Sequence, residues 1–121
     1  MLNFSGGLYY FGYGVKQDYS LAKDYYEKSA KQDNDRAQFR IGELYYFGDG
    51  VNQDYSLAKD YYEKSAKQGN AGAQYNLGEL YYFGDGVKQD YVLAKDYYEK
   101  AAKQGHYKAN ERLKLIKLNS K

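Results

Sequence analysis

The sequence predicts an all-α fold, an α-solenoid in which helix pairs stack one after another, and three observations lead to this prediction. The segment at residues 41–51 returns at 77–87, and a less regular copy stands at 5–15, each 36 residues from the next. Every unit contains two stretches whose apolar residues recur at helical spacing. Glycines follow these stretches, where helices commonly end. A fixed period of this length is typical of stacked repeats.

The first helix of each unit, here called helix A, is clearest in the second unit. One face of it carries, at positions i, i+4, i+7 and i+8, the residues Ala37, Ile41, Leu44 and Tyr45. This spacing is that of an amphipathic helix. Gly48 is expected to end the helix, because glycine readily takes the left-handed conformation that closes one.

The second helix of the unit, here called helix B, follows a short loop. Asp54 precedes it and is expected to cap its N-terminus, because the carboxylate can accept a hydrogen bond from a free backbone N–H there. An apolar stripe then runs at helical spacing from Leu57 to Ala66, and Gly69 is expected to end the helix.

Two glycines, Gly42 and Gly78, lie inside helix A, where glycine costs roughly 1 kcal/mol relative to alanine. We therefore expect close packing at both positions, with a Tyr or Leu side chain of helix B filling the space. Ala58 and Ala94 are the small residues of helix B that would let the two helices approach each other.

A recurring string resembles the Sel-one-like repeat (SLR), a relative of the tetratricopeptide repeats. It is Ala-x-x-x-(Leu/Ile)-Gly-x-Leu-Tyr-x-x-Gly-x-Gly-Val, then Asp, Ala, Tyr-Tyr, Lys-(Ser/Ala)-Ala and Gln-Gly, at residues 37–69 and 73–105. The first unit departs from it at Met1, which replaces the leading Ala, and at Asp33, which replaces the last Gly. The resemblance implies antiparallel helix pairs in a right-handed superhelix, with helix A on the concave surface. It also implies an adaptor role in multiprotein complexes.

We expect one repeat domain over residues 1–121. Its parts are a first repeat with a degenerate start at 1–36, a second at 37–72, a third at 73–108 and a capping helix at 109–121. Repeats two and three are identical at 27 of 36 positions, which indicates recent duplication or consensus design. The capping helix is expected to have one lysine-rich, hydrated face and one apolar face, formed by Leu113, Leu115, Ile116 and Leu118.

Composition argues against several classes of partner and cofactor. There is no cysteine and a single histidine, His106, which is expected in a loop, so we predict no metal site and no other cofactor. No apolar run is long enough to span a bilayer, so we expect no membrane partner. The net charge is +2, with the basic excess in the last residues rather than along the repeats, and we expect no nucleic-acid partner. We expect a cytoplasmic protein, with export left open if Met1 is not the natural start.

An enzymatic alternative comes from the string Ser-x-x-Lys, which occurs at Ser20–Lys23 and Ser56–Lys59. In penicillin-interacting hydrolases this string holds the nucleophile, and some relatives of the repeat family carry β-lactamase names. The companion strings Ser-Asp-Asn and Lys-Thr-Gly are absent, and Val92 replaces the serine in the third repeat. We therefore expect no catalytic residues.

Helix A carries a second stripe, made of aromatic and acidic residues and offset from the packing stripe described above. In such a superhelix this second stripe would line the concave groove, so it is the candidate binding surface. Aromatic residues in a stripe more often pack in a core, and we expect this of Phe39, Phe47 and Phe83. For the tyrosines and glutamates we expect an open groove, since Glu is almost never buried unpaired. The candidate ligand-binding residues are Tyr10, Phe39, Glu43, Tyr46, Tyr75, Glu79 and Tyr82.

The function that we expect is a non-catalytic scaffold that holds a protein or peptide segment in this groove. The alternatives are the penicillin-interacting hydrolase and a purely structural fragment or consensus design without a ligand. At the N-terminal end, Leu8, Tyr9 and Phe11 follow a weak first helix without a polar cap, so we also expect weak self-association through that end.

Overall fold

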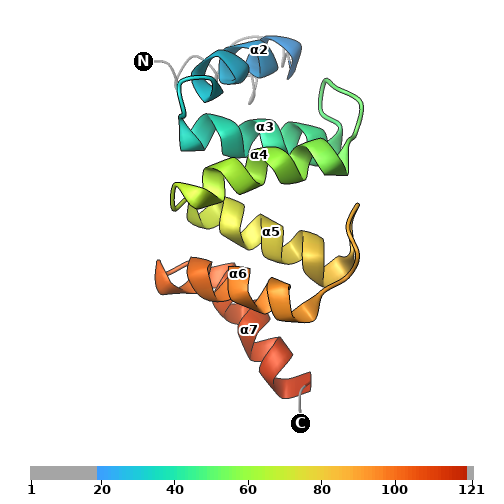
Figure 1. The fold of residues 1–121 in the computed structure, drawn as a ribbon, viewed down its shortest axis with the longest axis vertical. Coiled ribbons are helices and arrows are strands. Elements are labelled where there is room, and N and C mark those ends of the chain that lie inside the picture. The colour runs from blue at the N-terminus through green and yellow to red at the C-terminus, as the bar shows by residue number, and fades with distance from the viewer. Residues whose placement is uncertain (1–18, 120–121) are drawn as a thin grey trace.

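The computed structural model describes residues 19–119, with side chains described for residues 23–118. This part of the chain contains helices and no strand, as the sequence predicts. The helices are α2 (Tyr19–Ala30), α3 (Asp35–Phe47), α4 (Tyr55–Lys67), α5 (Ala71–Phe83), α6 (Tyr91–Lys103) and α7 (Tyr107–Asn119). They succeed one another along the long axis of the molecule, from α2 at the N-terminal end to α7 at the C-terminal end (Figure 1). Helices α3, α5 and α7 are of type A, and α2, α4 and α6 are of type B.

Hydrogen bonds from polar side chains fix where the helices begin. Asp54 Oδ1 accepts a hydrogen bond of 3.0 Å from the Leu57 N–H, so the predicted cap is confirmed. Asn70 Oδ1 accepts one of 2.9 Å from Ala73 in the same way at the start of α5. At the other end of α3, Gly48 has a φ of 73° and its N–H donates to the Leu44 carbonyl, which closes the helix as predicted.

The close packing predicted at the two helical glycines is confirmed. A Cβ at Gly42 would lie 2.5 Å from ring atoms of Tyr62, and one at Gly78 would lie 2.6 Å from ring atoms of Tyr98. Both tyrosines belong to type B helices and are fully buried, and so are Ala58 and Ala94. Because only a hydrogen fits at each glycine, α3 and α5 each pack the tyrosine of the following B helix directly against their backbone.

Within the described part of the chain, the buried residues form three clusters along the stack rather than one centre. The middle cluster joins α4 to α5 and includes Ala58, Tyr62, Leu77 and Leu80. A cluster toward the N-terminal side joins α2 and α3, and one toward the C-terminal side joins α6 and α7. Each layer of side chains therefore contacts its neighbours in the stack, as in other repeat arrays.

The last helix, α7, matches its predicted capping role only in part. Leu113 and Ile116 pack against the C-terminal core cluster as expected. Leu115 and Leu118 do not, because their side chains are 48% and 64% exposed. The prediction of a single apolar face that turns inward is therefore wrong for these two leucines. They stand 36 residues after Glu79 and Tyr82 and so continue the second stripe of helix A.

Several sequence-based expectations fall outside the described residues. They include the start of the first repeat, the groove residue Tyr10 and the proposed self-associating end with Leu8, Tyr9 and Phe11. Across the described part, no helix has the length and apolar character needed to cross a membrane.

Candidate functional site

A hollow of about 400 Å³ lies along the A helices, and most of its lining comes from the second stripe. Helices α3, α5 and α7 contribute most of its walls, and one ring of α4 completes them. The lining residues are Glu43, Tyr46, Phe47, Tyr62, Tyr75, Asn76, Glu79, Phe83, Lys108 and Arg112. We refer to it below as the A-helix hollow.

The hollow brings together four of the predicted groove residues, namely Glu43, Tyr46, Tyr75 and Glu79. Phe39 does not line it. Its ring packs against the middle core cluster and lies beside Gly72, between α3 and α5, so the expected packing of Phe39 is confirmed. Tyr82 packs against the C-terminal cluster and contacts the ring of Tyr91 at a centroid distance of 5.2 Å.

Two phenylalanines that were expected to pack between helices are instead exposed. Phe47 is 61% exposed and Phe83 is 52% exposed, and both line the hollow. That expectation is therefore wrong for them. Each is the last residue of its helix and is followed at once by a glycine in the left-handed conformation, so its side chain stands beyond the region where adjacent helices cover each other.

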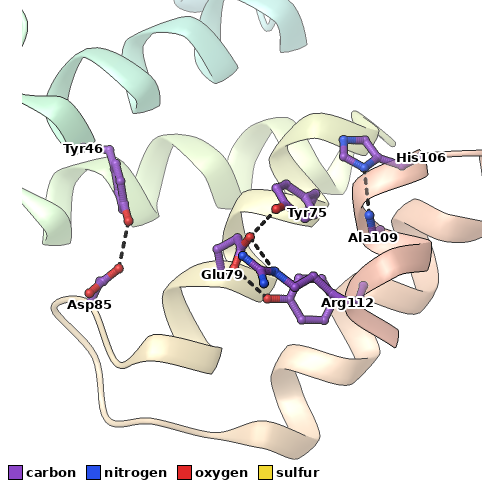
Figure 2. A network of polar contacts seen from close by, with 8 residues as sticks. Tyr46, Tyr75, Glu79, Asp85, His106, Ala109 and Arg112 are labelled. Atoms are coloured by element: carbon purple, nitrogen blue, oxygen red, sulfur yellow. Dashed lines mark hydrogen bonds and ion pairs between the residues drawn. The ribbon is translucent and has the colours of Figure 1, made fainter. Parts of the chain in front are cut away.

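Glu79, which lines the hollow, is the centre of a cluster of polar contacts (Figure 2). Its carboxylate accepts hydrogen bonds from the Tyr75 hydroxyl, from the Tyr98 hydroxyl at 2.9 Å and from Arg112 Nε at 3.0 Å. These donors come from α5, α6 and α7, so one carboxylate ties three helices together. Burial and the bond to Glu79 raise the pKa of Tyr75 to about 12, which keeps its hydroxyl protonated as a donor.

Glu43 occupies the equivalent position on α3 but has a different environment. Its carboxylate pairs with Arg40 of the same helix, with 2.8 Å between Oε1 and Nη1. Loss of hydration raises the pKa of Glu43, and the pairing with Arg40 opposes this shift. At the position that Arg112 has in α7, α5 carries the uncharged Asn76, which also lines the hollow.

Tyr46, in the last turn of α3, is bonded to the loop that follows α5. Its hydroxyl donates a 2.8 Å hydrogen bond to Oδ2 of Asp85, which follows α5 (Figure 2). Burial and this bond raise the pKa of the hydroxyl well above its usual range. The ring also contacts Phe47 edge-on at 4.9 Å, so Tyr46 both orders the α5 loop and supports the exposed phenylalanine.

His106 lies between α6 and α7, in the loop position predicted from the sequence. Its Nδ1 accepts a 3.2 Å hydrogen bond from the Ala109 N–H, so the imidazole caps α7 (Figure 2). The ring stacks on Tyr75 at a centroid distance of 4.7 Å. Among residues 23–118, no His, Cys, Asp and Glu side chains gather in a group able to hold a metal ion.

The second Ser-x-x-Lys string, on α4, lies outside the lining of this hollow. Ser56 is exposed in the first turn of α4, and neither it nor Lys59 lines the hollow. The side chain of Ser20 belongs to the part that the structure does not describe. No observation on the described residues favours the hydrolase alternative.

Besides Phe47 and Phe83, four lining residues were missed from the sequence: Tyr62, Asn76, Lys108 and Arg112. Asn76 and Arg112 belong to one repeat position, which Arg40 occupies in the second repeat. This position changes from one repeat to the next, whereas the predicted stripe was read from residues that return. A search for variation at a fixed repeat position, instead of for identity, would have drawn attention to it.

Comparisons with known proteins agree with this geometry. A model of the Sel1 repeat family matches residues 3–34, 35–70 and 71–106, which is most of the chain. No curated protein matches the chain at a significant level. Proteins with Sel1 repeats are generally non-catalytic and commonly act as scaffolds for protein interaction.

Three solved structures are similar to the chain. A Sel1 repeat protein from Oxalobacter formigenes shares 35% identity with a TM-score of 0.90 over 95% of this chain and 47% of its own. A protective antigen with an SLR fold from uropathogenic Escherichia coli shares 33% identity with a TM-score of 0.87, over 93% and 24%. Cysteine-rich protein B of Helicobacter pylori shares 25% identity with a TM-score of 0.74, over 79% and 72%.

The chain therefore spans less than half the length of the first two of these structures. The resemblance found in the recurring string, the family match across all three repeats and the helical stack agree. The chain belongs to the Sel1 repeat family.

Proposed function

We propose that this protein is a non-catalytic scaffold that binds an extended segment of a partner protein along the A-helix hollow. The observation that carries the proposal is the exposure of Phe47 and Phe83 at the hollow, one on α3 and one on α5. Exposed aromatic rings next to a concavity are the usual anchors of protein recognition.

The shape of the apolar surface favours an extended segment over a small molecule. The two phenylalanines occupy equivalent positions on successive A helices, so they repeat along the stack. Leu115 and Leu118 continue exposed apolar surface on α7. A partner chain that crosses the three A helices would contact both phenylalanines and also the two leucines, which lie outside the lining of the hollow and beyond the reach of a compact ligand bound in it.

The test is a selection of random 12-residue peptides on the folded protein, followed by affinity measurements on the peptides that it yields. The double variant Phe47→Ala plus Phe83→Ala should weaken their binding by roughly tenfold or more, because it removes two anchors. The matched control is Val92→Ala plus Tyr107→Ala. It removes exposed apolar side chains outside the hollow and should leave affinity unchanged.

Two outcomes would count against a binding role for this surface. One is a set of selected peptides that bind both double variants equally well. The other is a selection that gives no peptide above background on a protein whose helical circular dichroism signal is intact.

A further inference from the structure

One arginine of the protein itself, Arg112, shows how a guanidinium can be held against the A helices, and we call its site the template below. Arg112, on α7, places its guanidinium between an acid and a ring of the preceding A helix, α5. Its Nε donates to Glu79 at 3.0 Å, and its Cζ lies 5.4 Å from the centroid of the Phe83 ring. This arrangement combines an ion pair with a cation–π contact, which suits a planar guanidinium.

The same acid and ring are present one repeat earlier without the guanidinium. Glu43 and Phe47 stand 36 residues before Glu79 and Phe83, and both line the hollow. At the position of Arg112, however, α5 carries Asn76. Asparagine is shorter and uncharged, so it can provide neither the ion pair nor the cation–π contact.

The cation nearest to Glu43 does not take this place. Arg40 pairs with Glu43 along their own helix, three residues apart, and its Cζ lies 5.3 Å from the ring of Phe39, which packs between helices. The Phe47 ring lies at the other end of α3 and is 61% exposed. Beside α3 the hollow therefore has an acid, Glu43, and an exposed ring, Phe47, and α5 adds the amide of Asn76; the cations in its lining, Lys108 and Arg112, come from α7.

We propose that this part of the hollow binds an arginine side chain of the partner segment, with the guanidinium placed against α3 as that of Arg112 is placed against α5. This names the chemistry of the ligand and rests on the function proposed above. Arginine is favoured over lysine because a planar, delocalised cation pairs with a carboxylate through two parallel hydrogen bonds and stacks on a ring, whereas an ammonium is a compact, strongly hydrated charge.

The first experiment uses four acetylated and amidated tripeptides, Ala-X-Ala, with arginine, lysine, citrulline or leucine at X. Binding is followed through the backbone amide shifts of the labelled protein. The arginine peptide should shift amides of α3 and α5 next to the hollow. Citrulline keeps the shape without the charge and should bind roughly tenfold more weakly, and lysine should fall between the two.

The decisive variants exchange the residues at the template position. Asn76→Arg supplies the guanidinium from the protein itself and should abolish binding of the arginine peptide. Val92→Arg is the control for added positive charge, because it places an arginine at an exposed residue outside the hollow and should leave binding within about twofold. Arg112→Asn empties the template on α7 and should create a second arginine site, seen as new shifts near Phe83.

The outcomes separate the ligand chemistry from the proposed function. If citrulline and leucine peptides bind as well as arginine, or if Asn76→Arg binds the arginine peptide like the unchanged protein, the arginine site does not exist. Selected 12-residue peptides that depend on Phe47 and Phe83 but contain no arginine would retain the scaffold function and overturn the arginine site. If the arginine tripeptide shifts the amides but the selection yields no 12-residue peptide, the arginine site is retained and the scaffold function is overturned.

Discussion

Two junctions between successive A helices, α3 with α5 and α5 with α7, are built from nearly the same residues and differ in how far they are closed. In the second junction Glu79 collects donors from three helices, and one of them is the arginine of the next A helix. In the first, Glu43 pairs within its own helix, and the residue of α5 at the position of Arg112 is the uncharged Asn76. The repeated backbone is shared, so the side chains at a few variable positions decide between a closed junction and an open one.

The variable positions change together. At several equivalent positions the two junctions carry different residues, and the residue of the second junction is polar or charged. One such pair is Phe39 with Tyr75. The other pairs are Asn70 with His106, Gly72 with Lys108 and Asn76 with Arg112. Tyr75 gains a hydroxyl that donates to Glu79, and Arg112 gains the charge that pairs with it. The exchanges thus complete, in the second junction, a polar cluster that the first junction does not have.

The largest expected effect tests what the two junctions have in common. Gly42→Ala and Gly78→Ala should each lower the free energy of unfolding by about 2–3 kcal/mol, because the new Cβ would collide with the buried ring of Tyr62 or Tyr98. Urea unfolding of the two variants measures this. Equal losses would show that the buried tyrosine packs against the helical glycine in the same way in both repeats. A gain in stability at either position would contradict the packing described for it.

The next effect separates the junctions. Glu79→Gln should lower the free energy of unfolding by about 2 kcal/mol, because three hydrogen-bond donors lose an ionised acceptor. Glu43→Gln should change it by no more than about 0.5 kcal/mol, since its pair with Arg40 is half-exposed and its carboxylate is poorly hydrated. The two variants are controls for each other under the same urea titration. Losses of equal size would mean that Glu43 is held as tightly as Glu79.

Local signals in the sequence were sufficient for most of the fold. The caps at Asp54 and Gly48, the tyrosine packing at Gly42 and Gly78 and the loop position of His106 depend on neighbours within one repeat. Such features return every 36 residues, so the period itself made them visible. The all-α architecture followed from the same repetition.

The details of the site depend on contacts that do not recur with the 36-residue period. The exposure of Phe47 depends on where α3 ends relative to α5, and no residue pattern records that offset. The bond from Tyr46 to Asp85 joins residues 39 apart, which is longer than one repeat. Arg112 lies at a position that the neighbouring repeat fills with Asn, so a search for recurring residues passes over it.

A smaller effect is expected when the open junction is closed by substitution. Asn76→Arg should raise the free energy of unfolding by about 1 kcal/mol, because the new guanidinium would bond to the poorly hydrated Glu43. The combination with Glu43→Gln is the control and should remove the gain, which makes the two substitutions a double-mutant cycle. A gain that survives in the combined variant would come from helix propensity rather than from the ion pair.

The smallest expected effect concerns the helix caps, which also differ between the junctions. Asn70 caps α5 through its amide oxygen at every pH, whereas His106 caps α7 through Nδ1, which accepts a hydrogen bond only while it is unprotonated. Burial, with a smaller contribution from Lys108, lowers the pKa of His106 below its ordinary value of 6.5. The folded state therefore disfavours the proton. The contribution of the cap to stability is present above pH 6.5 and is lost as the pH falls through the lower pKa of the folded protein.

His106→Asn gives the second junction the cap of the first and tests this difference. The unchanged protein should lose about 0.5 kcal/mol between pH 7.5 and about pH 5 through this group, at the low end of what an N-cap contributes. In His106→Asn that part of the loss should disappear, while any loss from other groups remains in both proteins. The measurement is urea unfolding at a series of pH values, with Asn70→His as the reciprocal variant. Asn70→His should acquire the same acid loss at the start of α5, because its ring would replace the amide oxygen that now accepts from Ala73. Parallel pH profiles for all three proteins would mean that the imidazole does not act as a cap in solution.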